Sequence, residues 1–485
     1  MIPELQKQDY KNVFYYFEEI SKIPRGSGDN QRISDYLVEF AKKNGLSYRQ
    51  DELLNVVITR DATPGYENCP SVIIQGHMDM VCEKTPTSTH DFTTDGLELI
   101  VEGDWLRANN TTLGGDDGIA VAYGLALLSD PELKSPRLEV VITTDEETGL
   151  YGAKGLDTST LAAKYMINVD SENDDTVLTS CAGGLTGTTT LPIQRTTVTG
   201  TKVNVLLTGL RGGHSGIEIG HNRSNANKLL GRLLFDLRNA IDFDLIGMEG
   251  GSKDNVITRM ANAELVIDAS DLDTFKEEIL RIEAMYQKEF MASEPNLRIE
   301  LTVSEEDSYE VLSKLSFEKM LFLLVHAPYG VQAMSASIEG LVESSLNLGI
   351  FKVGEEEVTY CFSVRSSVSS AKHAISDKLE YLSAFLGADY VVRGEYPAWE
   401  YRADSKLRDL YSRIYKDMTG NNIKIEAIHA GLECGLFYEK ISDIDIISVG
   451  PNMSGIHTAQ EKLCISSSIF VYKVIERVLE EMKQL

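Results

Sequence analysis

Hydrophobic side chains recur every three or four positions through most of the first 45 residues of the chain. Val13 and Phe17 fall on one face of a helix, and Ile33 and Leu37 fall on one face of another. The loop between them, at residues 24–28, contains a proline and two glycines, which interrupt helices. The N-terminal segment is therefore predicted to form two amphipathic helices.

Apolar runs and helix-like segments then alternate along the chain. The apolar runs have the length of strands, and they occur at residues 53–60, 71–76, 138–144 and 165–169. Helical spacing occurs between them, at residues 117–129 and 157–163. Strands that alternate with helices are typical of a largely parallel sheet flanked by helices. This region is therefore predicted to be an α/β domain.

The pattern changes at residue 185, where threonine-rich alternation begins. From there a strand–helix–strand–helix order occurs twice, at residues 203–207, 225–239, 263–267 and 272–287, and again at 297–303, 317–325, 358–365 and 370–385. A repeated order predicts an α+β domain made of two related halves. Because the α/β pattern returns after residue 394, we expect residues 185–394 to be inserted into one discontinuous α/β domain, residues 1–184 and 395–485.

The amino-acid composition and net charge limit the kinds of partner that the protein can bind. Hydrophobic residues make up 42% of the chain and charged residues 25%, as in soluble globular proteins. The net charge is −28, from 74 acidic and 46 basic residues, and it repels nucleic acids and anionic lipids, so we expect neither as a partner. An apolar leader, a long apolar run and a C-x-x-C pair are all absent from the sequence, which predicts a cytoplasmic protein with reduced cysteines.

A His-x-Asp pair is the first candidate site. His77 and Asp79 follow the apolar run at residues 72–76. Side chains two positions apart in extended backbone point to the same side. The pair therefore suits a metal-bound imidazole whose second ring nitrogen is held by a carboxylate.

Two acidic turns follow further along the chain. Asp116 and Asp117 lie in a glycine-flanked turn before a helix, where they are suited either to face a ligand or to cap the helix. Asp145 is followed by Glu146 and Glu147 at the end of a predicted strand, where like charges repel unless a cation or solvent relieves them. Neighbouring side chains point differently, so one of the two glutamates could bind a metal while the other faces water. A solvated acidic loop is the alternative.

Asp170 and His457 complete the set of candidate ligands. Asp170 ends the predicted strand at residues 165–169, and His457 lies near the end of the last strand. Two imidazoles and three carboxylates exceed the roughly four ligands of one zinc ion. Two ions that share one carboxylate can use them all, and three carboxylates with one hydroxide balance two divalent charges. We therefore expect two divalent metal ions, zinc in the first place and manganese or cobalt as alternatives.

The order of these motifs resembles a known family. H-x-D, G-G-D-D-G, D-E-E-T-G, N-V-D and a late G-I-H occur in the order found in the M20 family of zinc aminoacylases and carboxypeptidases. Residues 76–81, 212–216 and 429–435 are similar to its aminoacyl-histidine dipeptidase branch. The resemblance extends over essentially the whole chain. It implies an enzyme that hydrolyses small unblocked dipeptides with broad specificity, including Xaa-His.

The resemblance also implies roles for the metal ligands. Asp116 would bridge the two ions. His77 and Asp170 would complete one site, and Glu147 and His457 would complete the other. Relatives carry Ala or Asn beside the bridging aspartate, whereas this chain has Gly115 and Asp117. Asp117 therefore remains the alternative bridging residue.

Further roles are implied for residues that do not bind metal. Glu146 would be the general base, and Asp79 would orient His77. The peptide bond between Asp116 and Asp117 would be cis.

The inserted domain resembles the lid of this family, at twice its usual length. In the smaller members, a lid dimerises and a histidine from the partner's lid enters the active site. A doubled lid would let His214, in the glycine-rich loop at residues 212–216, contact an oxyanion in its own chain, whether the protein is a monomer or a homodimer. Asn255 and Arg365 would bind the substrate carboxylate, and a structural arginine is the alternative for Arg365.

Two other functions remain open at this point. An N-acyl-amino-acid deacylase would use the same metal chemistry on a different amide. A non-catalytic relative that binds metal or amino acids belongs to another class. The second is disfavoured because Glu146, which metal binding alone does not need, is present.

Overall fold

The computed structural model describes residues 2–485 and divides into two compact units. Unit 1 comprises Met1–Cys181, Tyr401–Ala427 and Leu432–Leu485, and unit 2 comprises Ala182–Glu400 and Ile428–Gly431. The borders lie a few residues from those expected after residues 184 and 394. Residues 428–431 lie outside the α/β domain in which they were expected. They belong to unit 2, where the carbonyls of Ile428 and Ala430 accept the backbone N–H of Ala182.

Unit 1 is built on an eight-stranded sheet. Its strands run in the order β1 (Ser47–Gln50), β2 (Val56–Arg60), β6 (Leu138–Thr143), β3 (Val72–His77), β7 (Tyr165–Asn168), β21 (Asp445–Ser448), β8 (Thr176–Cys181) and β20 (Lys424–Ile428). The central strands β6, β3, β7 and β21 are parallel, whereas β1, β2 and β8 pair antiparallel with their neighbours. The predicted largely parallel centre is confirmed.

The helices of unit 1 share one hydrophobic core with this sheet. They are α2 (Val13–Ser21), α3 (Gln31–Lys43), α4 (Gly115–Ser129), α10 (Lys406–Thr419) and α12 (Ile465–Glu481), with the shorter α1 (Pro3–Gln6), α5 (Tyr151–Gly155) and α11 (Glu433–Lys440). Helix α4 is apolar on nearly every side and is buried almost throughout, as such helices are. A small sheet is formed by β4 (Leu99–Glu102), β5 (Trp105–Ala108), β22 (Met453–Ser454) and β23 (Lys462–Cys464).

The prediction of a helix at residues 157–163 is wrong. This segment is a loop, and the helix nearby is α5, which ends at Gly155. The buried carboxylate of Glu139 on β6 accepts the backbone N–H groups of Ala162 and Ala163. Those donors therefore bond to a side chain that is distant in sequence, which local spacing cannot reveal.

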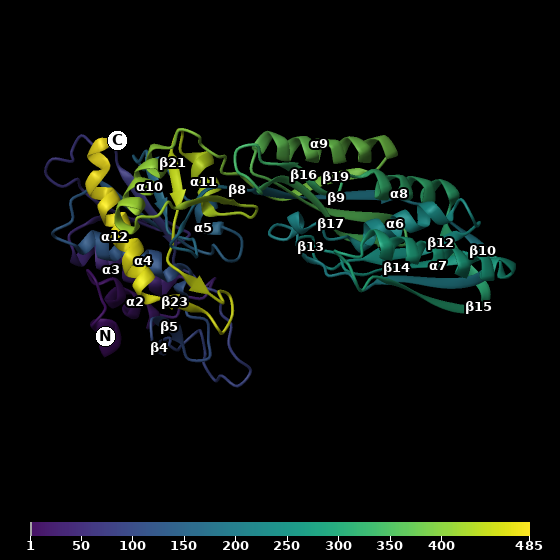
Figure 1. Cartoon of the computed structure of the whole chain (residues 1–485), viewed down its shortest axis with the longest axis horizontal. Coiled ribbons are helices and arrows are strands. Elements are labelled where there is room, and N and C mark those ends of the chain that lie inside the picture. Colours follow the sequence, from purple (N-terminus) through teal and green to yellow (C-terminus); the bar gives the residue numbers. More distant parts are fainter. Residues whose placement is uncertain (1) are drawn as a thin grey trace. The chain divides into compact units, whose positions relative to one another are not determined.

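Unit 2 is built on a nine-stranded sheet. The main path runs in the order β15 (Arg298–Leu312), β10 (Arg195–Thr208), β14 (Ala261–Ile267), β12 (Asp244–Gly250), β17 (Val342–Val353), β18 (Glu357–Ser366), β9 (Gly183–Pro192) and β19 (Asp389–Tyr396), and β16 (Gly330–Met334) pairs with β17. Helices α6 (Ala226–Leu237), α7 (Leu272–Glu289), α8 (Lys314–His326) and α9 (Ser369–Leu386) pack on it through one core and can be followed in teal and green in Figure 1.

The sheet consists of two halves with the same topology, as predicted. One half is β10-α6-β12-β14-α7-β15, and the other is β9-α8-β17-β18-α9-β19. If the four strands of a half are numbered along the chain, their order from the outer edge of the sheet inward is fourth, first, third, second in both halves. The halves join where β12 pairs with β17. The division of the repeat was wrong, because the strand expected to open the second half is β15, the last strand of the first. The true opening strand, β9, precedes the entire first half.

Two short strands and three 3-10 turns complete the list of elements. Strands β11 (Gly213–His214) and β13 (Val256–Ile257) pair with each other in unit 2. The 3-10 turns are η1 (Ile219–His221), η2 (Ala269–Asp271) and η3 (Met482–Gln484). Among the helices of residues 2–485, none combines the length and hydrophobicity that a bilayer crossing requires.

Candidate metal and active site

Three neighbouring strands bring the acidic motifs of unit 1 to one edge of its sheet. Strands β6, β3 and β7 are adjacent and parallel, so their carboxyl ends meet. His77 is the last residue of β3, the acidic turn at residues 145–147 follows β6, and Asp170 follows β7. Open α/β sheets place their binding sites at this edge. The strand positions thus explain why motifs far apart in sequence form one cluster.

His77 lies at the centre of this cluster. Its Nε2 atom is 3.1 Å from Asp116 Oδ1 and 3.9 Å from Asp170 Oδ1. Its Nδ1 atom is 3.4 Å from Asp79 Oδ1, and both side chains are almost completely buried. Asp79 also accepts the backbone N–H of Glu146 at 3.1 Å. The position of Asp79 therefore constrains both the imidazole and the start of the acidic turn.

Asp116 lies between the two histidines. Its Oδ2 atom is 3.2 Å from His457 Nε2, while its Oδ1 atom faces His77. His457 Nε2 is also 3.0 Å from the carboxylate of Glu147. Burial disfavours the ionised form of Asp116, but hydrogen bonds with His457 and His77 hold its pKa below the usual value. Asp116 is thus shared by two groups of side chains.

Asp117 occupies a different environment. It is completely buried, and its Oδ2 atom accepts the backbone N–H of His77 at 3.2 Å. Burial raises its pKa well above the usual value. The peptide bond between Asp116 and Asp117 is cis, as the resemblance predicts. Of the two neighbouring carboxylates, the one on Asp116 faces both histidines.

The donor set fits divalent cations. Three groups of side chains have ligand atoms within 4.8 Å of one another, namely His77 with Asp116 and Asp170, Asp116 with Glu147 and His457, and His77 with Glu146 and Glu147. Burial, and then nearby carboxylates, raise the pKa of Asp170 well above its usual value. Hydrogen bonds with Asp116 and Glu147 raise the pKa of His457 to about 10. Such crowding of negative charge favours any cation that can enter.

Glu146 has the environment of a tunable acid–base group. Burial, and then the nearby Glu433 and Glu147 carboxylates, raise its pKa to about 8 against the opposing effect of His77. A carboxyl group with a pKa near neutrality can both accept and return a proton. A carboxylate oxygen of Glu146 also lies within 4.8 Å of ligand atoms of His77 and Glu147, so Glu146 belongs to the same cluster.

Some buried charged residues beside the cluster were not singled out from the sequence. Glu433 is completely buried and accepts hydrogen bonds from Thr143 Oγ1, at 2.6 Å, and from Gln75. Burial raises its pKa to about 7. Arg25 and Glu461 are also buried and bond to the loops that carry the candidate ligands. For Arg25 and Glu433, a charged residue within a glycine-containing segment was the available signal, whereas Glu461 lies in a polar segment that gives none.

The candidate residues of unit 2 include a histidine in a tight turn. His214 lies in β11, and its Nδ1 atom accepts the backbone N–H groups of Gly216 and Ile217 at 3.2 and 3.3 Å. Because Nδ1 is an acceptor, the proton of the neutral ring is on Nε2. Burial, and then the charge of Arg365, lower the pKa of His214. The turn thus holds a neutral imidazole whose Nε2–H can donate.

Arg365 and Asn255 lie in the same unit. Arg365 is on β18 and is 8% exposed, and its Nη1 atom donates to the hydroxyl of Tyr396 at 2.9 Å. Its Nε atom is buried without a hydrogen-bond partner among residues 2–485. Asn255 is half-buried, and its carbonyl accepts the backbone N–H of Ser215, next to His214. The unit therefore brings a cation with one unpartnered donor, Arg365 Nε, near the histidine turn.

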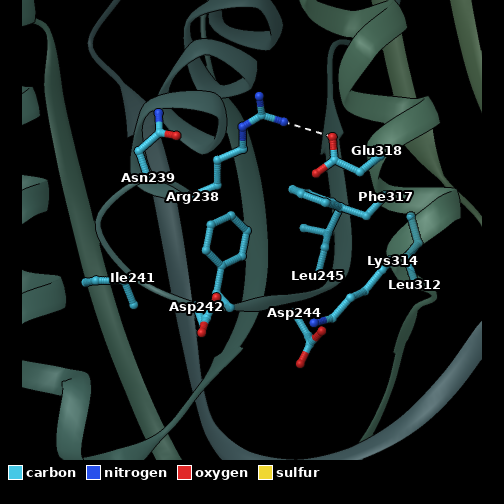
Figure 2. A pocket seen from close by; sticks show the side chains of 11 residues that line it. Arg238, Asn239, Ile241, Asp242, Asp244, Leu245, Leu312, Lys314, Phe317 and Glu318 are labelled. Atoms are coloured by element: carbon cyan, nitrogen blue, oxygen red, sulfur yellow. Dashed lines mark hydrogen bonds and ion pairs between the residues drawn. The ribbon is translucent and has the colours of Figure 1, made fainter.

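A hollow elsewhere in unit 2 contains none of these residues. It measures about 270 Å³ and lies between the end of α6 and the start of α8 (Figure 2). Arg238 on its rim is paired with Glu318 at 2.8 Å. The rings of Phe243 and Phe317 pack edge to face there, 5.5 Å apart. The candidate chemistry therefore lies outside this hollow.

Comparisons with known proteins agree with the motif order. The model of peptidase family M20/M25/M40 matches residues 73–481. The chain is 34% identical over 481 residues to the cytosol non-specific dipeptidase of Escherichia coli K12, covering 99% of each chain. It also matches the crystal structure of aminoacylhistidine dipeptidase from Vibrio alginolyticus with a TM-score of 0.92 and 34% identity, covering 97% of this chain and 98% of that one. The aminopeptidase PepT of Bacillus cereus, at 14% identity and a TM-score of 0.57 over 98% and 100% of the two chains, shares the fold.

Proposed function

The chain belongs to peptidase family M20/M25/M40, and we propose that it is a metallo-dipeptidase that hydrolyses small unblocked dipeptides with broad specificity, including Xaa-His. The observation that carries the proposal is the position of Asp116, shared by the group with His77 and Asp170 and the group with Glu147 and His457. Two full-length relatives at 34% identity are named as dipeptidases, one for aminoacyl-histidine substrates.

The five side chains would hold two divalent ions, for which zinc is our first choice and manganese or cobalt the alternatives. Asp116 is proposed as the shared ligand, in preference to Asp117, because its two oxygens face different histidines. When bound, such ions polarise a peptide carbonyl and lower the pKa of a water molecule.

The residues around the ligands would supply the remaining chemistry. Glu146 would take the proton from the attacking water and deliver it to the leaving amine, so that one carboxyl group acts as base and then as acid. Asp79 would orient His77 through Nδ1, as partners of metal-bound imidazoles do.

Unit 2 would recognise the rest of the substrate. We propose that His214 donates its Nε2–H to the oxyanion that develops from the peptide carbonyl. Arg365 would pair with the C-terminal carboxylate, for which its unpartnered Nε provides a further donor, with Asn255 as a second polar contact. We propose that each active site uses unit 1 and unit 2 of the same chain, whether the protein is a monomer or a homodimer.

A cytoplasmic location is part of the proposal. It rests on the Escherichia coli relative, which is named as a cytosolic enzyme. The scattered cysteines, all free in the structure, are compatible with a reducing compartment.

A substrate panel tests the function. Protein of measured metal content is incubated with Ala-Ala, an Xaa-His dipeptide, β-Ala-His and an acetylated amino acid, and the released amines are quantified. We expect hydrolysis of the free dipeptides, loss of activity after chelation and return of activity when zinc is added. Preferential cleavage of the acetylated amino acid would favour a deacylase. Metal-loaded protein that leaves every compound intact would favour a non-catalytic binding role.

A further inference from the structure

Two buried charged side chains, Arg25 and Glu461, lie beside the proposed metal site without being candidate ligands. They are 2% and 3% exposed, respectively. Removing a charge from water is costly unless hydrogen bonds compensate. The partners of these two groups therefore indicate why they are buried there.

Glu461 binds the loop that precedes α4. Its carboxylate accepts the backbone N–H groups of four consecutive residues, namely Leu113 at 2.7 Å, Gly114 at 3.0 Å, Gly115 at 2.7 Å and Asp116 at 3.3 Å. Successive N–H groups that converge on one anion form a stable concave site. The last of these residues is Asp116, so the carboxylate of Glu461 fixes the backbone from which that side chain projects.

Arg25 binds the same loop and a second one. Its guanidinium donates to the carbonyls of Met78, at 3.0 Å, Asp79, at 3.3 Å, and Gly114. The first two carbonyls belong to the turn that follows His77. Arg25 therefore ties the turn that contains His77 and Asp79 to the loop that contains Asp116.

The glycines of the G-G-D-D-G segment leave room for these two side chains. A Cβ atom at Gly114 or at Gly118 would collide with Arg25 Nη2. A Cβ atom at Gly115 would lie 3.3 Å from the Glu461 carboxylate. The glycine pattern that first drew attention to the aspartates thus also accommodates the charges that hold them.

We propose that Arg25 and Glu461 are positioning residues that set the location of Asp116 between the two metal sites. The inference rests on the proposed sharing of Asp116. Glu461 lies four positions after His457, on the segment that joins β22 to β23. Glu461 thus contacts the segments of two of the three ligands proposed for one ion: its carboxylate holds the backbone of Asp116, and its backbone N–H donates to the carbonyl of Thr458, next to His457. The other ion, held by His77 and Asp170 as well, would lose the support of Asp116 alone.

Zinc binding to the Glu461→Gln variant tests this asymmetry. Metal-free protein is titrated with Zn²⁺ alone, in competition with a chromophoric chelator, so that turnover plays no part. We expect the ion held by His77, Asp116 and Asp170, here called the first ion, to bind nearly as in the wild type. The second ion, held by Asp116, Glu147 and His457, should bind roughly 10–100-fold more weakly, the usual scale for groups that support metal ligands. The kcat at limiting zinc should fall while the KM for a dipeptide is unchanged, and excess zinc should restore kcat. Wild-type affinities for both ions would overturn the proposal.

Asp445→Asn is the matched control. Asp445 is a buried carboxylate of unit 1, 5% exposed, that accepts hydrogen bonds from Ser405 Oγ at 2.6 Å and from the backbone N–H of Leu407 at 3.0 Å. Both of these partners lie outside the loops that carry candidate ligands. We expect a lower unfolding temperature and unchanged zinc affinities. An equal loss of the second ion in Asp445→Asn and Glu461→Gln would reduce Glu461 to a structural role and overturn the proposal.

Arg25→Lys provides a second variant if Glu461→Gln does not fold. A lysine keeps the charge, but its compact ammonium lacks the planar fork that reaches several carbonyls at once. Because Arg25 contacts both the turn after His77 and the loop before Asp116, we expect both ions to bind more weakly, each by less than the loss expected for the second ion in Glu461→Gln. Wild-type zinc binding in Arg25→Lys would contradict the proposal. Wild-type protein that binds two zinc ions without hydrolysing dipeptides would refute the proposed function and leave this inference intact.

Discussion

The candidate residues of the two units have opposite electrostatic character. In unit 1, carboxylates crowd around His77 and His457, and hydrogen bonds with Asp116 and Glu147 raise the pKa of His457 to about 10. In unit 2, burial and the charge of Arg365 lower the pKa of His214. The first environment favours cations, and the second favours an anion or a polarised oxygen. The contrast suggests that metal chemistry belongs to unit 1 and recognition of the substrate to unit 2.

The structural elements that hold the candidate residues also differ between the two units. In unit 1, His77, the acidic turn at residues 145–147 and Asp170 lie at or just after the ends of buried parallel strands. Asp79, Asp117 and Glu461 hold the neighbouring loops through hydrogen bonds to backbone N–H groups. His214 lies in a two-residue strand within a glycine-rich turn, and Arg365 lies on a long strand. If this division is correct, substitutions in unit 1 should act on metal content or kcat, and those in unit 2 should leave the metals in place.

The largest effect is expected for Glu146→Gln. The amide keeps the size of the side chain but cannot accept the proton of the attacking water, so kcat should fall at least about 100-fold with metal content unchanged. Steady-state kinetics with metal analysis measures both quantities. Glu172→Gln, which removes an exposed acidic charge near Asp116, should retain most activity. Near-normal turnover in Glu146→Gln would remove Glu146 from the mechanism.

His214→Ala should have the next largest effect. Loss of one donor to a developing oxyanion costs about 10²–10³-fold in kcat. His221→Ala, at an exposed position in the same segment, is the control and should be nearly silent. Metal content should be unchanged in both variants.

A mixture of two inactive variants tests whether His214 acts within its own chain. Glu146→Gln and His214→Ala chains are co-expressed and purified together. Each chain then lacks one essential group, so the mixture should stay inactive. Recovery of a substantial part of wild-type activity would show that unit 2 serves a neighbouring subunit.

Arg365→Ala should act mainly on substrate binding. We expect the KM for dipeptides with a free carboxylate to rise about 10–100-fold, because a charge-assisted bidentate contact is lost. Dipeptide amides, which lack that carboxylate, should be affected much less. Arg393→Ala, at an exposed position on β19, is the matched control. An equal rise for dipeptides and their amides would indicate a structural arginine.

The smallest of these effects concerns pH. Glu146 must be ionised to act as a base, so kcat/KM should rise with pH through its pKa. Burial raises that pKa from 4.5 to about 8, whereas bound cations favour the ionised form. The midpoint of the rising limb should therefore lie between 4.5 and about 8 in the metal-loaded enzyme. A pH profile of kcat/KM that falls throughout this range would be inconsistent with Glu146 as the base.

Local patterns predicted much of unit 1. The two-residue spacing of His77 and Asp79 and the position of Asp170 after an apolar run follow from strand geometry, which a sequence displays directly. The repeated topology of unit 2 was also predicted from the order of its elements.

Long-range pairing accounts for the features that local patterns did not predict. Strand β9 belongs to a half whose other elements follow an entire intervening half, and the order of elements cannot reveal that pairing. The contacts of Arg25 and Glu461 with the loop before α4 join segments separated by many strands. The loop at residues 157–163 depends on Glu139, a side chain of another strand. Each error thus reflects a contact between distant segments.

The dependence of dipeptide hydrolysis on added metal tests the proposed two-ion site most directly. Metal-free protein receives increasing equivalents of Zn²⁺, and the initial rate with one dipeptide is measured at each step while bound zinc is quantified. We expect two ions per chain at saturation and a rate that continues to rise as the second ion binds. A full rate at one bound ion per chain, or a rate that chelation leaves unchanged, would contradict the shared-aspartate site.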